Sequence, residues 1–177
     1  VAEAQSAPDR ALRAYEATLA LDPTDARALA AIVDVLEAQA RWPELVSAIR
    51  RRSQAAGSGW QQRQDLVRIA NIQASFLDAP KDAIAIWSEV SSAYGESADV
   101  VDALSELYTR TAAHASLAEL LGRAAEREDA HLASVRCRLG ETYFKQLADA
   151  PAAVAAYRRA LLQCLAERTN PLRSADI

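Results

Sequence analysis

The chain has 177 residues and a formal net charge of −4, and 51% of its residues are hydrophobic. It contains only five Gly and six Pro, too few for an all-β fold, which needs a turn about every ten residues, whereas helix formers such as Ala, Leu and Glu are abundant. The acidic balance also argues against the Lys and Arg clusters that displace counterions from nucleic acid. We therefore expect an all-α protein with no nucleic-acid partner.

The sequence shows no targeting segment. It has no apolar run near the roughly eighteen residues of a transmembrane helix, and its start lacks the charged-then-apolar pattern of a signal peptide. We therefore expect no membrane partner and favour the cytoplasm. The chain has no Met at position 1 or elsewhere, so we expect a fragment or a processed chain, which leaves the compartment open.

Corner residues and helical periodicity divide the chain into helices. The first helix is expected over about 8–21, with Pro8 in its first turn. The second is expected over about 25–40, capped by Thr24 or Asp25. From this second helix onward the pattern predicts helical hairpins, and the second helix is the first half of the first hairpin. They are expected over about 25–57, 60–95, 97–128 and 130–166.

The last hairpin has the clearest pattern, because its small and large residues are spaced to pack on each other. A lone hairpin cannot bury its apolar faces, so it is expected to stack on neighbours. The residues that carry this pattern are Leu139, Gly140 and Tyr143 on its first helix and Ala153, Tyr157 and Ala160 on its second.

The same pattern recurs along the chain at an offset of 70 to 72 residues. An offset shared by independent elements predicts a unit of about 72 residues that contains two hairpins, and hence a basic repeat of about 36. The recurring sets are Ala11 and Tyr15 with Ala83, Trp87, Ala153 and Tyr157, Leu45 and Ile49 with Leu117 and Leu121, and Asp78-Ala79-Pro80 with Asp149-Ala150-Pro151.

A helical hairpin of this length, with small and large residues in alternation, resembles the tetratricopeptide repeat (TPR) family. The match covers about residues 8–165, with a one-residue insertion after Lys145. The resemblance implies an all-α, right-handed α-α superhelix (solenoid) of about nine antiparallel helices. It implies one domain over 1–168, made of a half-repeat over 8–23 and the four hairpins, and we expect a flexible tail over 169–177.

The resemblance also implies a function, that of a protein-protein interaction scaffold that binds a partner peptide or protein along a concave groove. The Lys/Asn/Arg clamp with which some members hold a C-terminal carboxylate is absent. Because acids gather on the third hairpin, we hypothesise a partner with basic or mixed charge. The residues expected to face the groove are Arg27, Asp34, Glu37, Asp65, Arg68, Asp99, Asp102, Glu106, Arg110, Arg138, Glu141 and Lys145.

No motif for catalysis, a cofactor or a metal stands out. The sequence has no Gly-rich phosphate loop or nucleophile elbow, and neither His114 nor His131 has ligands at metal spacing. We therefore expect no enzyme, no cofactor and no metal. The alternative is a regulatory or sensory arm of a larger multidomain enzyme or transcription regulator. A second alternative is an RNA-processing helical repeat. It would need a basic inner wall, whereas the residues expected on that wall are mixed to acidic.

Several conspicuous residues are interpreted as structural. Cys137 and Cys164 are expected to be buried thiols. Trp42 and Trp87 are expected in the core, whereas Trp60 has no role in the repeat and is expected to be partly exposed. The ends of the stack are expected to expose apolar faces, which leaves homodimerisation open as a property of the fragment.

Overall fold

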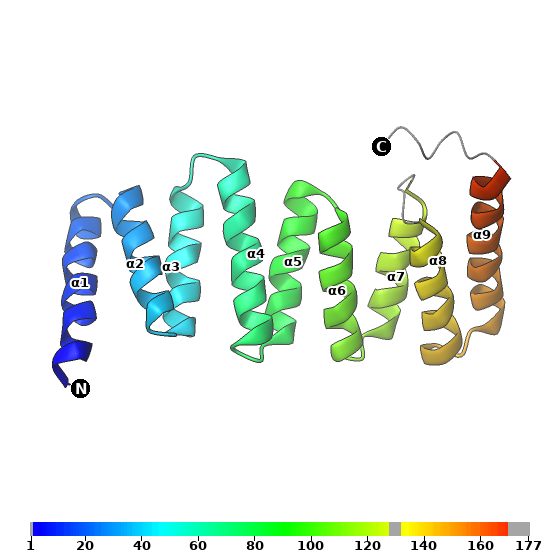
Figure 1. Cartoon of the computed structure of the whole chain (residues 1–177), viewed down its shortest axis with the longest axis horizontal. Coiled ribbons are helices and arrows are strands. Elements are labelled where there is room, and N and C mark those ends of the chain that lie inside the picture. The colour runs from blue at the N-terminus through cyan, green and yellow to red at the C-terminus, as the bar shows by residue number, and fades with distance from the viewer. Residues whose placement is uncertain (1, 128–131, 170–177) are drawn as a thin grey trace. The chain divides into compact units, whose positions relative to one another are not determined.

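The computed structural model describes residues 2–127 and 132–169, and these residues contain helices and no strands (Figure 1). This confirms the predicted all-α class. The elements are α1 (Ala2–Leu21), α2 (Ala26–Ala38), α3 (Trp42–Ala55), α4 (Gly59–Ser75), α5 (Pro80–Tyr94), α6 (Ala98–Arg110), α7 (His114–Ala125), α8 (Leu132–Glu141), the π-helical turn η1 (Thr142–Gln146) and α9 (Ala150–Thr169).

The chain divides into two compact units, unit 1 over Val1–Gly95 and unit 2 over Glu96–Ile177. Unit 1 holds α1 and the hairpins α2–α3 and α4–α5, and unit 2 holds the hairpins α6–α7 and α8–α9. Each unit thus contains two hairpins, the content predicted for the 72-residue period. The single domain over 1–168 stays a prediction, and the expected tail lies, apart from Thr169, outside the described residues.

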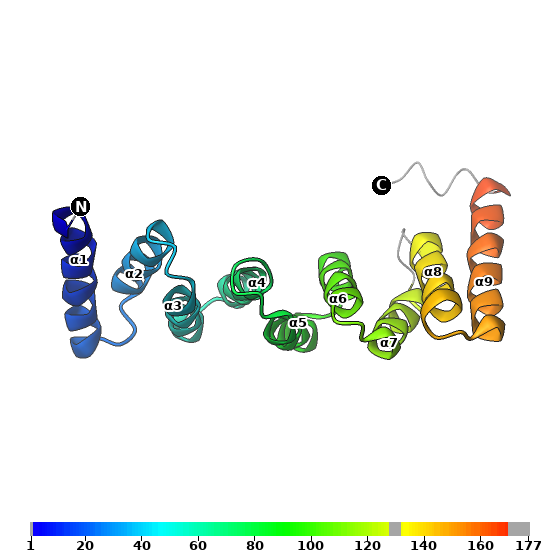
Figure 2. The same cartoon turned by 90° about the horizontal axis from the view of Figure 1, so that it is seen from below.

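Within each unit the helices pack on their neighbours in chain order. In unit 1, α1 packs on α2 and α3 packs on α4, and in unit 2, α7 packs on α8. Figure 2 shows α2 and α4 in one row and α3 and α5 in a second row. We call α2, α4, α6 and α8 the first helices and α1, α3, α5, α7 and α9 the second helices. The core between them includes Leu29, Val33, Leu45, Ile49, Ile69, Trp87, Val90, Leu104, Leu120 and Leu121.

Each hairpin turns at one non-glycine residue with a positive φ angle, which we call the corner residue. These are Ala40, Asp78, Ala112 and Ala148, with φ angles of 47° to 53°. The residue that follows each corner residue donates its backbone N–H to an earlier carbonyl. At the corners Ala40 and Ala112 this carbonyl lies five residues before the donor, and at the corners Asp78 and Ala148 it lies six residues before the donor. Corner geometry therefore alternates from hairpin to hairpin, which is a structural counterpart of the double period.

The hydrogen bonds correct one part of the sequence alignment. The backbone N–H of Asp149 donates to the carbonyl of Tyr143, and the backbone N–H of Ala79 donates to the carbonyl of Gln73, in both cases six residues back. Asp149 is therefore the equivalent of Ala79 and lies 70 residues after it. The matching of Asp78-Ala79-Pro80 with Asp149-Ala150-Pro151 at an offset of 71 is wrong by one residue. Proline fits both sites because the first turn of a helix needs no N–H donor there.

The inserted residue of the last hairpin lies in η1. Ser105 of α6 and Gly140 of α8 stand at the same position of their repeats. The corner residue Ala112 comes seven positions after Ser105, whereas Ala148 comes eight positions after Gly140. A π-helical turn accommodates one extra residue inside a helix without unwinding its ends. Because η1 spans Thr142–Gln146, it contains the position directly after Lys145, where the insertion was expected.

Helix α1 begins earlier than predicted, at Ala2, and Pro8 lies inside it rather than in its first turn. The segment Ala2-Glu3-Ala4-Gln5 consists of helix formers. A proline this close to the start of a helix removes only one backbone hydrogen bond and is therefore tolerated at a cost.

The start of α2 provides a test of local stability. The Asp25 carboxylate accepts a hydrogen bond of 2.7 Å from the backbone N–H of Ala28. Replacing Asp25 by alanine is expected to lower the free energy of unfolding by about 1 kcal/mol, because that donor loses its partner. Urea unfolding followed by circular dichroism measures the change. Asp34→Ala, which removes an exposed carboxylate of the same helix, serves as control and is expected to change stability by less than about 0.5 kcal/mol.

Candidate partner-binding surface

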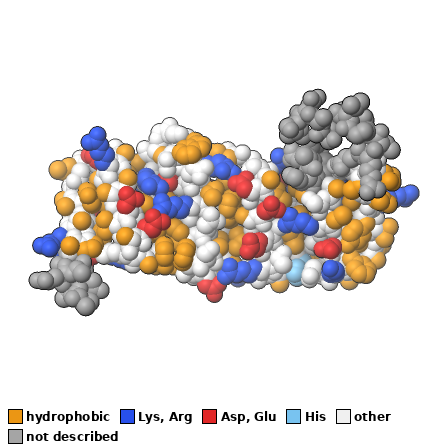
Figure 3. Space-filling view, in the orientation of Figure 1, with side chains coloured by type: hydrophobic (Ala, Val, Ile, Leu, Met, Phe, Trp, Pro, Cys, Tyr) orange, Lys and Arg blue, Asp and Glu red, His pale blue; other side chains and the backbone are white. Residues whose placement is uncertain are grey.

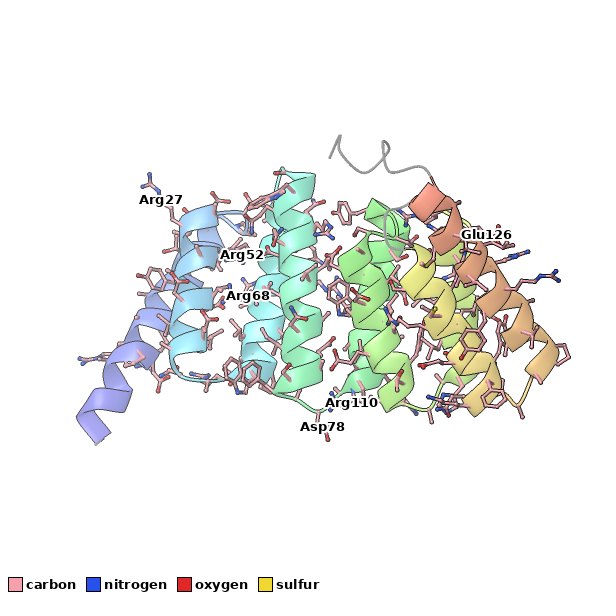
Figure 4. All side chains as sticks on the ribbon, turned by 45° about the vertical axis from the view of Figure 1, so that its right-hand side comes forward. Arg27, Arg52, Arg68, Asp78, Arg110 and Glu126 are labelled. Atoms are coloured by element: carbon pink, nitrogen blue, oxygen red, sulfur yellow. The ribbon has the colours of Figure 1, made fainter. Side chains whose placement is uncertain are left out.

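The twelve residues predicted to face a groove all lie on first helices or on η1. Helices α2 and α6 carry seven of them, and all seven are exposed. In Figure 4, Arg27 projects from the start of α2, whereas Arg68 lies between neighbouring helices of unit 1. The exposed seven are Arg27, Asp34, Glu37, Asp99, Asp102, Glu106 and Arg110.

Ion pairs join neighbouring first helices across this surface. In unit 1, Arg68 of α4 lies 2.6 Å from Glu37 of α2. In unit 2, Arg138 of α8 lies 2.7 Å from Asp102 of α6. Acidic and basic side chains accordingly lie side by side over α2 to α4 in Figure 3. Partly exposed pairs of this kind contribute only about 0–1 kcal/mol each, so a partner can displace them at little cost.

Asp65 differs from the other predicted residues because it is buried. Only 1% of its side chain is exposed, and its carboxylate accepts two hydrogen bonds from Arg52, of 3.1 Å from Nε and 2.5 Å from Nη2. The Gln61 amide donates a third, of 3.0 Å. The carboxylate is therefore satisfied inside the contact between α3 and α4, so Asp65 holds these helices together and is not available to a partner.

An aromatic hollow of about 560 Å³ lies on unit 1 between α2, α3 and α4. The rings of Trp42 and Phe76 stack at 4.0 Å on one side of it, and Trp60, which is 69% exposed, contributes to its rim. The predictions for Trp60 and for the buried Trp87 are confirmed. Trp42 is half-buried against an exposed Phe76 rather than in the core, because its corner position leaves one ring face open.

Two adjoining hollows, of about 250 Å³ and 460 Å³, lie on unit 2 between α6 and α8. They share the side chains of Ser105, Thr109 and Arg138. The smaller one has an apolar floor provided by α7, and η1 closes one side of it. Predicted residues that line one hollow or the other are Asp102, Glu106, Arg110, Arg138, Glu141 and Lys145.

The residues at the floor of the smaller hollow carry no sequence signal of a binding site. Leu117 and Leu121 follow the core pattern of α7, and nothing in that pattern distinguishes a core residue from the base of an open hollow. The third floor residue, His114, has a buried Nδ1 atom without a hydrogen-bond partner among the described residues. An unsatisfied polar atom of this kind is a point at which a bound group can donate or accept.

The two cysteines are exposed, not buried as expected. Cys137 lies on α8 and Cys164 on α9, two helices with weak apolar asymmetry, so periodicity was a poor guide to the buried side. In residues 2–127 and 132–169, no three side chains of His, Cys, Asp and Glu are grouped as a metal site requires. None of the helices in these ranges combines the length and apolar composition needed to cross a bilayer.

Comparisons with known proteins yield structural neighbours and no sequence relatives. No protein-family model and no curated protein matches the chain. A crystal structure of MamA matches 94% of this chain and 94% of its own, at 14% identity and a TM-score of 0.56. YrrB, described as a TPR protein with an unusual peptide-binding site, matches 90% of this chain and 79% of its own, at 15% identity and a TM-score of 0.54. This likeness confirms the predicted TPR-like fold.

Proposed function

We propose that this chain is a non-catalytic scaffold that binds a peptide or protein partner over the first helices, and that the face formed by α6 and α8 in unit 2 is its main contact. The observation that carries the proposal is the pair of adjoining hollows on that face, with an apolar floor and a charged rim. Concave sites with a few converging polar groups are the usual form of binding sites. The peptide-binding site described for YrrB, a structure with the same fold, supports peptide binding as the class of function.

The charges on α6 favour a partner segment with basic or mixed charge. Glu106 is exposed and has neither an ion-pair nor a hydrogen-bond partner among the described residues. Asp102 is held only by the exposed pair with Arg138, and Asp99 accepts a hydrogen bond from Ser97. A lysine or arginine of the partner would neutralise Glu106 first, and would compete with Arg138 for Asp102.

Charge reversal on α6 tests this proposal. The variant with Asp99→Arg, Asp102→Arg and Glu106→Arg is expected to lose a partner that the unchanged chain captures from lysate of the source organism, as identified by mass spectrometry. With the purified partner, the dissociation constant is expected to rise at least about tenfold, because three attractions become repulsions. Titration calorimetry gives this constant.

The matched control is Glu119→Arg, which reverses an exposed carboxylate on the second helix α7. It is expected to leave the dissociation constant unchanged. Equal capture by the triple variant and the unchanged chain would rule out the α6 face as the contact. Weakening by Glu119→Arg alone would instead place the partner on the second helices.

A further inference from the structure

The aromatic hollow on unit 1 runs along helix α4 for most of its length. The residues of α4 that line it fall into two adjacent rows with steps of three or four residues, which places them on one face of the helix. Trp60 stands at one end of this face, and Phe76, stacked on Trp42, stands at the other. Phe76 comes sixteen residues after Trp60. At a rise of about 1.5 Å per residue, the two aromatic ends lie about 24 Å apart along the helix.

The charged side chains that line the hollow are balanced within it. Arg68 pairs with Glu37 at 2.6 Å, and the carboxylate of Asp65 is held by Arg52. In Figure 4, Arg52 lies above Arg68 along the helices of unit 1. A charged residue of an occupant would lose water here without meeting an unpaired counter-charge, which is costly. The hollow therefore selects an uncharged occupant, in contrast to α6, where Glu106 is unpaired in the described part of the chain.

Two amide side chains in the middle of the hollow are free to bind an occupant. Gln64 and Asn71 are exposed, and within residues 2–127 and 132–169 neither amide has a hydrogen-bond partner. An amide both donates and accepts, which suits the N–H and C=O groups of a peptide backbone. An extended segment carries these groups free, whereas a helix uses them internally. The middle of the hollow therefore fits an extended segment and not a helix.

The aromatic ends and the amides agree on one register. An extended chain advances about 3.3 Å per residue, so about 24 Å corresponds to about seven steps, and the two ends contact the first and the eighth residue of a segment. Gln64 lies about 6 Å beyond Trp60 along α4, and Asn71 lies about 10 Å farther. These spacings place the amides beside the third and the sixth residue, both within the uncharged middle of the segment.

We propose that the aromatic hollow binds an extended, uncharged segment of a partner protein, about eight residues long, with a large apolar residue at each end. One end residue packs on Trp60 and the other on the stacked rings of Trp42 and Phe76. Between them, Gln64 and Asn71 hydrogen-bond to the backbone of the segment. This site lies in unit 1, and it does not depend on the function proposed for the α6 and α8 face of unit 2.

No stretch of residues 1–177 meets these requirements. Within 2–127 and 132–169 no stretch outside the helices is longer than four residues, so these parts of a second copy offer no extended segment of sufficient length. Residues 170–177 include Arg173 and Asp176, which the balanced charges of the hollow disfavour. The occupant is therefore a segment of another protein.

The probe is the uncharged peptide acetyl-Phe-Ser-Gly-Asn-Ser-Gly-Ser-Phe-amide, titrated by calorimetry into the whole chain. We expect saturable binding with a dissociation constant below about 1 mM. Trp60→Ala and Phe76→Ala are each expected to raise this constant about tenfold, because one aromatic end is lost. Both side chains are largely exposed, at 69% and 57%, so neither change removes a core residue.

Three further measurements separate the proposed register from a merely adhesive aromatic surface. Removing three residues between the two Phe residues of the peptide is expected to weaken binding about tenfold, because only one end is then reached at a time. The double variant Gln64→Glu/Asn71→Asp keeps the side-chain shapes but removes both donors, and is expected to weaken binding to a similar extent. Replacing both Phe residues by Lys is expected to abolish binding.

Phe144→Ala is the matched control, since it removes an aromatic ring of η1 that is 60% exposed and lies in unit 2. This variant and the triple charge reversal on α6 are both expected to leave the affinity for the peptide unchanged, so the two proposed sites fail or succeed separately. Weakening by either would overturn the assignment to unit 1.

The proposal is also overturned if the peptide shows no saturable binding up to about 1 mM, or if Trp60→Ala, Phe76→Ala or the double amide variant leaves its affinity unaltered. Equal binding of the shortened or the Lys peptide has the same meaning. A dimer in sedimentation that Trp60→Ala dissociates would make a second copy the occupant. Stronger peptide binding after deletion of residues 170–177 would make that segment the occupant.

Discussion

Replacing Arg52 by methionine is expected to lower the free energy of unfolding by about 3–5 kcal/mol, because it leaves a buried carboxylate without its cation. Methionine keeps the length and much of the apolar stem of arginine. The Asp65 side chain, only 1% exposed, would retain the Gln61 hydrogen bond alone. Urea unfolding monitored by circular dichroism, with linear extrapolation to water, measures the change.

The neighbouring residue provides the control for this prediction. Arg51 pairs with Glu16 at 2.8 Å, but the two side chains are 45% and 51% exposed. Arg51→Met is therefore expected to cost only about 0–1 kcal/mol. The double variant Arg52→Met/Asp65→Leu is expected to recover most of the loss, because no buried charge remains. Equal effects of Arg51→Met and Arg52→Met would contradict the buried network.

Introducing a methyl group at Gly140 is expected to destabilise the last hairpin. A Cβ atom there would lie 2.8–2.9 Å from ring carbons of Tyr157, closer than carbon atoms pack. Alanine gains about 1 kcal/mol of helix propensity over glycine, but displacing the ring costs about 1–3 kcal/mol. The difference of these two effects is a net loss of up to about 2 kcal/mol in the free energy of unfolding, which urea unfolding measures.

Gly122 offers the opposite expectation in the same unit. It lies inside α7, and a Cβ atom there would meet no atom within 4 Å. Gly122→Ala is therefore expected to stabilise the protein by up to about 1 kcal/mol. The double variant Gly140→Ala/Tyr157→Leu, which places leucine as at Leu121, is expected to relieve the overlap. A stabilising effect of Gly140→Ala alone would mean that the Tyr157 ring moves away without loss.

The hairpins and their period were predictable because they depend on local signals. Apolar residues at helical spacing and the corner at residues 78–80 identified the helices after α1 within a few residues, whereas α1 begins about six residues before its predicted start. Trp60 was predicted to be exposed because it falls outside the repeat pattern, and the structure agrees.

The candidate site was less predictable because it depends on contacts between helices. Asp65 stands at a position expected to face a partner, but only the structure shows Arg52 of the preceding helix opposite it. Leu117 carries the same apolar signal whether it lies in a core or at the base of a hollow. The π-helical turn over residues 142–146 is defined by its backbone hydrogen bonds. The sequence of these residues carries no distinctive signal for such a turn.

The alternating corner geometry has a consequence for building longer or shorter versions of this protein. The hydrogen bond at each corner reaches five residues back after Ala40 and Ala112 and six residues back after Asp78 and Ala148. Deleting one hairpin would place two corners of the same type in succession, whereas deleting or duplicating two would keep the order. The natural module for recombination is therefore the pair of hairpins, and engineered arrays should grow in steps of about 72 residues.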